Sequence, residues 1–187
     1  MNERLLTTHT SQDICTLFNQ TFYKTYNTKL IAGGLEPLYQ PASKDCSYHQ
    51  IIFAHDYFAS ALHEIAHWLV AGEQRRLQVD YGYWYEPDGR DEAQQAAFEK
   101  VEVLPQAIEW TLAVSCGFHF DVSSDNLSGL VINRLAFKKK VYQQVLILLN
   151  NGFSARTLML LDACQKKYQT NTLSVEDFEY QGMYQLV

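Results

Sequence analysis

The sequence predicts an α+β fold, a predominantly helical single domain over residues 1–187 that carries a small, mainly antiparallel sheet. Apolar residues recur at helical spacing in several long segments, and residues 28–54 instead contain short apolar runs separated by glycine and proline. No repeat, low-complexity tract or linker divides the chain. Its 47% hydrophobic and 19% charged residues are typical of a globular domain with its own core.

The first half of the chain predicts one helix, then the sheet. Residues 11–23 have helical apolar spacing, and Ser11 or Asp13 can cap the start of that helix. The short runs that follow, which we expect to be strands, are residues 29–32, 38–40 and 50–53.

A second helix is predicted over residues 57–70. Asp56 can cap its start, and Gly72 can supply the left-handed residue at which such a helix ends. This helix contains the motif His63-Glu64-Ile65-Ala66-His67, so we expect a zincin-like His-Glu-x-x-His helix.

The second half predicts a long helix from Asp91 to about Ser115, with a bend at Pro105, which lacks a backbone donor. Three further helical segments are expected: residues 133–149, residues 154–168 and a short capped turn at 174–177.

His63 and His67 lie four residues apart, so their rings project from the same face of the helix and can bind one metal ion. The surrounding residues 59–71 are largely apolar, and polar groups held against a core need a partner. Two histidines alone bind metal weakly, so a carboxylate from elsewhere is expected to complete the site.

The long helix offers that carboxylate. Glu102 and Glu109 border its apolar face, whereas Glu99 is expected to be solvated. We take Glu102, between two valines, as the third ligand and Glu109 as the reserve. His55 and His119 are isolated and are interpreted as structural or surface residues.

These ligands fit two kinds of metalloenzyme and one kind of metal site without catalytic activity. On zinc, Glu64 would be the general base of a cytoplasmic metallopeptidase; on Fe(II), two histidines and a carboxylate form the triad of a hydroxylase. A purely structural site would need a closed set of four protein ligands. No Gly-x-x-His extension follows His67, which disfavours a metzincin peptidase.

Several stretches resemble the bacterial elongation factor P hydroxylase family: residues 52–55, 59–68, 79–91, 101–107 and 123–127. The resemblance implies a non-haem metal enzyme that hydroxylates the β-lysylated lysine of elongation factor P. It implies His63, His67 and Glu102 as the ligands of a divalent metal. The metal expected from this resemblance is Fe(II), with zinc possible in the purified protein and molecular oxygen as co-substrate. A role for Glu64 stays open, because such an oxygenase needs no general base there.

The segment between the two ligand-bearing helices is a candidate wall of the site. Its aromatic residues can pack along a lysyl-lysine chain, and its carboxylates can pair with ammonium groups. The predicted substrate-binding residues are Asp80, Tyr83, Trp84, Tyr85, Asp88 and Arg90. The alternative is a plain turn at residues 87–89, with the aromatic side chains filling the core.

The formal charge of −6 disfavours direct nucleic-acid binding, and Lys138-Lys139-Lys140 is interpreted as a solvated helix face. The N-terminal residues lack the features of a signal peptide, and no apolar run is long enough to cross a bilayer, so we expect a cytoplasmic protein without membrane contact. The four scattered cysteines are expected to be reduced thiols.

Overall fold

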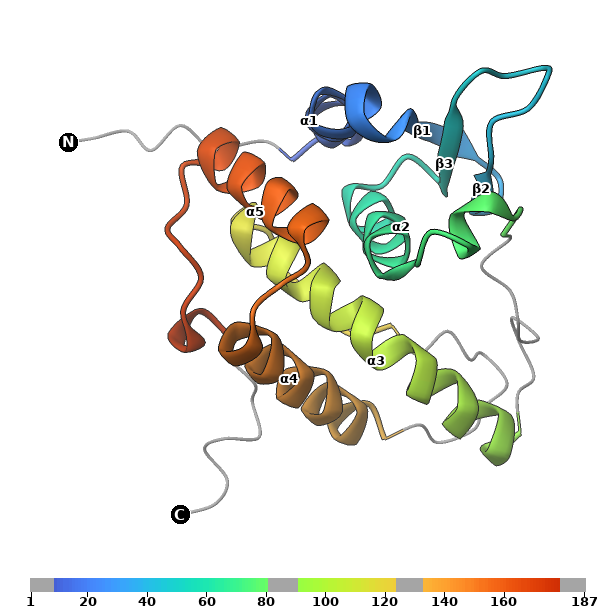
Figure 1. The fold of residues 1–187 in the computed structure, drawn as a ribbon. Coiled ribbons are helices and arrows are strands. Elements are labelled where there is room, and N and C mark those ends of the chain that lie inside the picture. Colours follow the sequence, from blue (N-terminus) through green and yellow to red (C-terminus); the bar gives the residue numbers. More distant parts are fainter. Residues whose placement is uncertain (1–8, 81–90, 124–132, 179–187) are drawn as a thin grey trace, which may run out of the picture.

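The computed structural model describes residues 9–80, 91–123 and 133–178. Within these ranges the predicted α+β fold, mostly helical with a small sheet, is confirmed (Figure 1). The elements are α1 (Ser11–Tyr26), β1 (Thr28–Gly34), β2 (Leu38–Gln40), β3 (His49–Ala54), α2 (Phe58–Val70), η1 (Arg75–Leu77), α3 (Glu92–Ser115), α4 (Arg134–Asn151), α5 (Ala155–Tyr168) and η2 (Val175–Asp177). Five predicted substrate contacts lie outside the described residues: Tyr83, Trp84, Tyr85, Asp88 and Arg90.

The sheet is mixed, so the prediction of a mainly antiparallel sheet is wrong in part. The strand order is β1-β3-β2, with β3 antiparallel to β2 but parallel to β1. The last strand thus inserts between the first two. Short apolar runs mark where strands lie along the chain, but the pairing order depends on contacts remote in sequence.

Helix α2 begins and ends without its two predicted local signals. Its N-cap is Tyr57, which makes no side-chain capping bond, and Asp56 instead has a left-handed backbone with φ 57°. Its C-cap is Ala71 in an extended conformation, and Gly72 has no positive φ. The prediction that Asp56 and Gly72 cap α2 is therefore wrong at both ends of the helix.

Two arginines replace the expected glycine at the end of α2. Arg156 of α5 donates to the carbonyl oxygens of Trp68, Leu69 and Ala71 at 3.0, 3.1 and 2.7 Å. Arg76 also donates to the Ala71 carbonyl, at 2.6 Å. The last carbonyl groups of a helix lack partners within it, and cations there interact favourably with the helix dipole.

Helix α1 is capped by Thr10, whose side chain accepts from the Asp13 backbone, so the prediction of Ser11 or Asp13 as its cap is wrong by one residue or more. Helices α3, α4 and α5 begin next to the residues at which their starts were predicted. Asp91 accepts from Gln94 in a capping box at the start of α3, and Asn133 and Ser154 cap α4 and α5. Helix α3 continues through Pro105 to Ser115.

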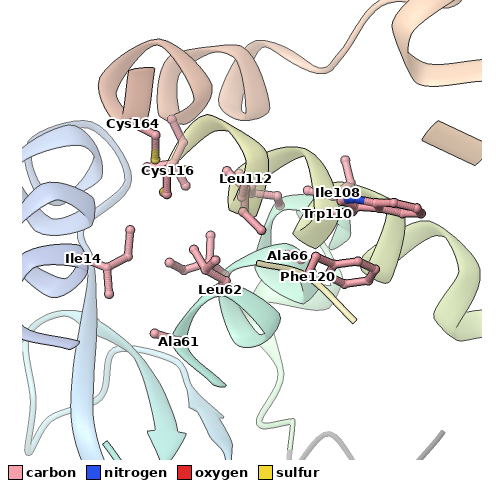
Figure 2. Close-up of a cluster of buried hydrophobic side chains, with 14 of the residues drawn as sticks. Ile14, Ala61, Leu62, Ala66, Ile108, Trp110, Leu112, Cys116, Phe120 and Cys164 are labelled. Atoms are coloured by element: carbon pink, nitrogen blue, oxygen red, sulfur yellow. The ribbon is translucent and has the colours of Figure 1, made fainter. Parts of the chain in front are cut away.

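Helix α3 forms the centre of the packing. In Figure 1, α2 and α4 lie on opposite sides of α3, and the sheet and α1 lie beyond α2. Fully buried side chains join these layers: Ile14, Leu62, Leu112 and Cys164 come from four different helices (Figure 2). This shared core fixes α2 against α3, and these two helices carry the predicted metal ligands. None of the described helices has the length and apolar character that crossing a bilayer requires.

Candidate metal centre

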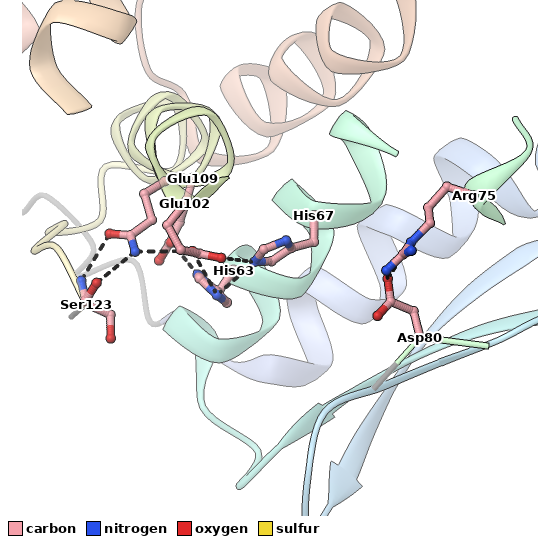
Figure 3. A network of polar contacts seen from close by, with 8 residues as sticks. His63, His67, Arg75, Asp80, Glu102, Glu109 and Ser123 are labelled. Carbon is pink, nitrogen blue, oxygen red and sulfur yellow. Dashed lines mark hydrogen bonds and ion pairs between the residues drawn. The ribbon is translucent and has the colours of Figure 1, made fainter. Parts of the chain in front are cut away.

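His63 and His67 on α2 and Glu102 on α3 converge on one point (Figure 3). The Nε2 atoms of the two histidines lie 3.1 Å apart. Glu102 Oε1 lies 3.3 Å from His67 Nε2, and Glu102 Oε2 lies 3.9 Å from His63 Nε2. One donor atom from each side chain lies within 4.8 Å of the other two. The structure thus brings together the three ligands predicted from the sequence.

Glu102 is held by a neighbour that the sequence analysis missed. Gln106, fully buried one turn further along α3, donates from Nε2 to Glu102 Oε2 at 3.3 Å. The same amide donates to the Ser123 carbonyl at 2.8 Å and accepts from the Ser123 backbone at 3.1 Å. The spacing of four from Glu102 is the signal that could have identified Gln106.

Glu109, the reserve ligand, has a different place. Its Oε2 lies 2.8 Å from Nδ1 of His63, on the other side of the ring from the cluster of Nε2 atoms. Glu109 is 9% exposed, and it lies seven residues after Glu102, two turns along the same helix face. Both carboxylates therefore serve one site, but only Glu102 faces the shared point.

The charges of this cluster are strongly coupled. Burial would lower the pKa of His63, but the carboxylates of Glu109, Glu64 and Glu102 outweigh it and raise that pKa to about 10. Burial would raise the pKa of Glu102, but the hydrogen bond and charge of His67, with the charge of His63, lower it to about 2. The site therefore favours a carboxylate at Glu102 together with positive charge beside it. A divalent cation meets that requirement as well as a proton does.

A cavity of about 240 Å³ opens beside the cluster and is lined by Glu64, His67 and Glu102. Trp68 and Phe98 are among its apolar walls, and Asp80 also lines it. Asp80 accepts from Arg75 at 2.7 and 3.0 Å and pairs by its backbone with Tyr39, so its carboxylate is already neutralised (Figure 3). Asp80 thus borders the cavity as half of an ion pair.

The remaining candidates lie away from the centre. His55 and His119 are exposed and do not belong to the cluster. Glu99 is not solvated as predicted: its side chain is 15% exposed and binds Lys140 at 2.8 Å.

Comparisons with known proteins identify the family of this chain. A family model described as elongation factor P hydroxylase matches residues 17–178. The chain belongs to the elongation factor P hydroxylase family. One relative, the elongation factor P lysine hydroxylase of Haemophilus influenzae, is 51% identical over 162 residues, which cover 87% of this chain and 91% of the relative.

Membership of the elongation factor P hydroxylase family confirms the resemblance seen in the sequence. It gives the metallopeptidase hypothesis no support, although the His-Glu-x-x-His motif alone allows both. The zincin-like description of α2 rests on the motif and stays a prediction.

Proposed function

We propose that this chain hydroxylates a lysine side chain of elongation factor P, using a metal held by His63, His67 and Glu102. The convergence of these three side chains on one point carries the proposal. The name of the 51% identical relative supplies the reaction and the substrate protein. In this proposal residues 1–187 form one hydroxylase domain, which acts in the cytoplasm together with the translation factor that it modifies.

The donor set fits the metal that the family implies. Two imidazole nitrogens and one carboxylate suit Fe(II), and three protein ligands leave positions open for other groups. When bound there, Fe(II) would supply the activation of molecular oxygen. The same donors also suit zinc, which the purified protein can hold in its place. The cavity lies beside His67 and Glu102, so a substrate side chain that entered it would reach the ligands.

The substrate that we propose is the lysine after it has received a β-lysyl group. Such a side chain is long and cationic, and the cavity offers the apolar surfaces of Trp68 and Phe98 along with carboxylates. Further substrate contacts proposed from the sequence are Asp80 at the cavity wall, together with Tyr83, Trp84, Tyr85, Asp88 and Arg90.

Glu64 is the residue best placed to bind the ammonium group. It lines the cavity, and no described residue forms a hydrogen bond with its carboxylate. Burial raises the pKa of Glu64 despite the opposing charges of His63 and His67, so a cationic group in the cavity would stabilise its ionised form. We therefore assign Glu64 to substrate binding rather than to the general-base role that a peptidase would need.

The test combines iron-loaded protein, β-lysylated elongation factor P, oxygen and an added two-electron reductant. A C–H bond of the modified side chain becomes C–OH, and the second oxygen atom leaves as water with the two electrons and two protons. Mass spectrometry should show one added oxygen atom on the modified peptide and none on peptides from unmodified elongation factor P. An unchanged mass with every reductant, using protein shown to contain iron, would contradict the proposal.

A further inference from the structure

We infer that Glu109 is a positioning residue for the metal site: it holds the His63 ring so that Nε2 presents its lone pair to the ion. The inference rests on the proposed function, since it concerns the same three ligands. It adds a fourth side chain, which does not coordinate the metal and acts through His63.

The hydrogen bond at Nδ1 decides which nitrogen of His63 is available. An imidazole has two ring nitrogens, and in its neutral form one carries the proton while the other carries the lone pair. An ionised carboxylate only accepts, so Glu109 at 2.8 Å requires the proton on Nδ1. Nε2 is then free to coordinate, and this is the atom that faces His67 and Glu102.

The burial of Glu109 indicates that this contact is its function. Its neighbours in sequence, Ile108 and Trp110, are 5% and 4% exposed, and Glu109 itself is 9% exposed. An ionised carboxylate in such surroundings is costly unless it is paired and hydrogen-bonded. The hydrogen bond that it forms within the described ranges is the one with His63.

The arrangement of the two helices makes Glu109 an integral part of the site. The earlier histidine, His63, contacts the later carboxylate, Glu109, whereas His67 lies closer to Glu102. Helices α2 and α3 therefore run antiparallel where they meet. Helix α3 supplies both a ligand, Glu102, and a residue, Glu109, that supports another ligand. Carboxylates behind metal-bound histidines fix the tautomer and raise the basicity of the ligand.

The experiment compares the Zn(II) affinity of wild-type protein with that of Glu109→Ala and Glu109→Gln, by competition with a chelator at fixed pH. Glu109→Ala should weaken binding by about 10- to 100-fold, the usual effect of losing such a partner. Glu109→Gln should retain part of the affinity, because its amide oxygen can still accept from Nδ1. The matched control is Glu99→Gln, a carboxylate on the same helix that binds Lys140 instead of the site.

A second measurement reports the ring directly. In the zinc-loaded wild-type protein, ¹⁵N-labelled histidine should give one state of His63 with a proton on Nδ1 that exchanges slowly. In Glu109→Ala that proton should exchange quickly, and the ring should coordinate through a mixture of nitrogens. Circular dichroism verifies folding, and Glu109→Gln provides the test if the alanine variant fails to fold.

The possible failures are distinguishable. Wild-type protein that binds neither Zn(II) nor Fe(II) would overturn the proposed function and this inference together. Wild-type protein that binds zinc while both Glu109 variants match it in affinity and in the His63 spectrum would overturn this inference alone. An equal loss of affinity in Glu99→Gln would also overturn it, because the effect would then come from any charge on α3.

Discussion

Glu102 and Gln106 lie one turn apart on α3 and are joined by a hydrogen bond of 3.3 Å, through which the predicted carboxylate ligand is tied to the backbone of Ser123. The amide of Gln106 is fully buried, so its three hydrogen bonds have no water to replace them. The position of Glu102 therefore depends on a residue that never touches the metal.

Gln106→Leu should accordingly weaken both the fold and the site. The half-buried N–H and C=O of Ser123 lose their hydrogen bonds to the Gln106 amide, which costs about 1–3 kcal/mol in the free energy of unfolding. Zinc affinity should fall as well, because Glu102 is freed to rotate. Denaturant unfolding and chelator competition measure the two effects. A leucine variant with unchanged zinc affinity would show that Glu102 is positioned without Gln106.

Glu102→Ala should abolish the stabilisation of the protein by metal. An ion that binds only the folded state stabilises it by about 2.7 kcal/mol at one hundred times the dissociation constant. The wild-type melting temperature should therefore rise with added Zn(II), and that of Glu102→Ala should not. An undiminished rise in the variant would show that the metal binds elsewhere. Glu99→Gln, which leaves all three ligands in place, is expected to behave as wild type.

The metal-free protein should lose stability as the solution becomes alkaline. The pKa of His63 is raised from 6.5 to about 10, so protonation favours the folded state. That stabilisation is complete below about pH 6.5 and disappears as the pH rises towards 10. Unfolding in urea with a chelator present, from pH 6.5 to 10, measures it. Glu109→Gln should flatten the curve, and identical curves for both proteins would contradict the assignment.

Zinc affinity should show the opposite dependence on pH. Binding at Nε2 displaces a proton from His63, so the affinity should rise by about tenfold for each pH unit below its pKa. Competition titrations between pH 6 and 8 test this, and they should also detect the release of about one proton per ion. Affinity that stays constant over this range would indicate that His63 is neutral before the metal arrives.

Glu64→Gln should impair substrate binding more than metal binding. Removing a carboxylate that pairs with an ammonium group costs roughly 1.5–3 kcal/mol, so the KM for β-lysylated elongation factor P should rise by about tenfold or more. Zinc affinity should stay close to wild type, since Glu64 is not among the converging donors. A lower kcat with unchanged KM would instead assign Glu64 to the chemical step.

Arg156→Ala should destabilise the end of the ligand-bearing helix α2. The guanidinium donates to three carbonyl oxygens there and lies 4.7 Å from the centre of the Trp68 ring. Its loss should cost about 1–3 kcal/mol in the free energy of unfolding. The control, Lys166→Ala, removes an exposed pair with Asp162 that is worth about 0–1 kcal/mol. Equal losses in both variants would assign Arg156 no special role.

The sequence predicted best those features that depend on neighbouring residues, and it failed where a feature depends on residues far away in the chain. The starts of α3, α4 and α5 at Asp91, Asn133 and Ser154 were predictable because a helix start depends on the next few residues. Gly72 failed as a helix end because Arg156, more than eighty residues away in the chain, satisfies the same carbonyl groups. The parallel pairing of β1 with β3 was likewise set by contacts remote in sequence.

The metal site likewise has features that the sequence predicted and features that depend on how distant segments pack. Spacing along α2 identified His63 and His67, and the apolar face of α3 limited the third ligand to Glu102 or Glu109, of which the family resemblance favoured Glu102. Spacing could not distinguish a ligand from its support, because Glu102 and Glu109 share one helix face. Which carboxylate meets which ring nitrogen depends on how α2 and α3 are packed, and a single sequence does not encode that in any local pattern.

The antiparallel packing of α2 and α3 also constrains the spacing of the two histidines and the two glutamates along their helices. His-x3-His on one helix is matched by Glu-x6-Glu on the other, and inserting one residue between positions 102 and 109 would turn one carboxylate by about 100° away from its imidazole. We expect insertions there to be far more harmful than most substitutions. The paired interval therefore describes this centre more completely than His-Glu-x-x-His does, because it includes the helix that faces the histidines.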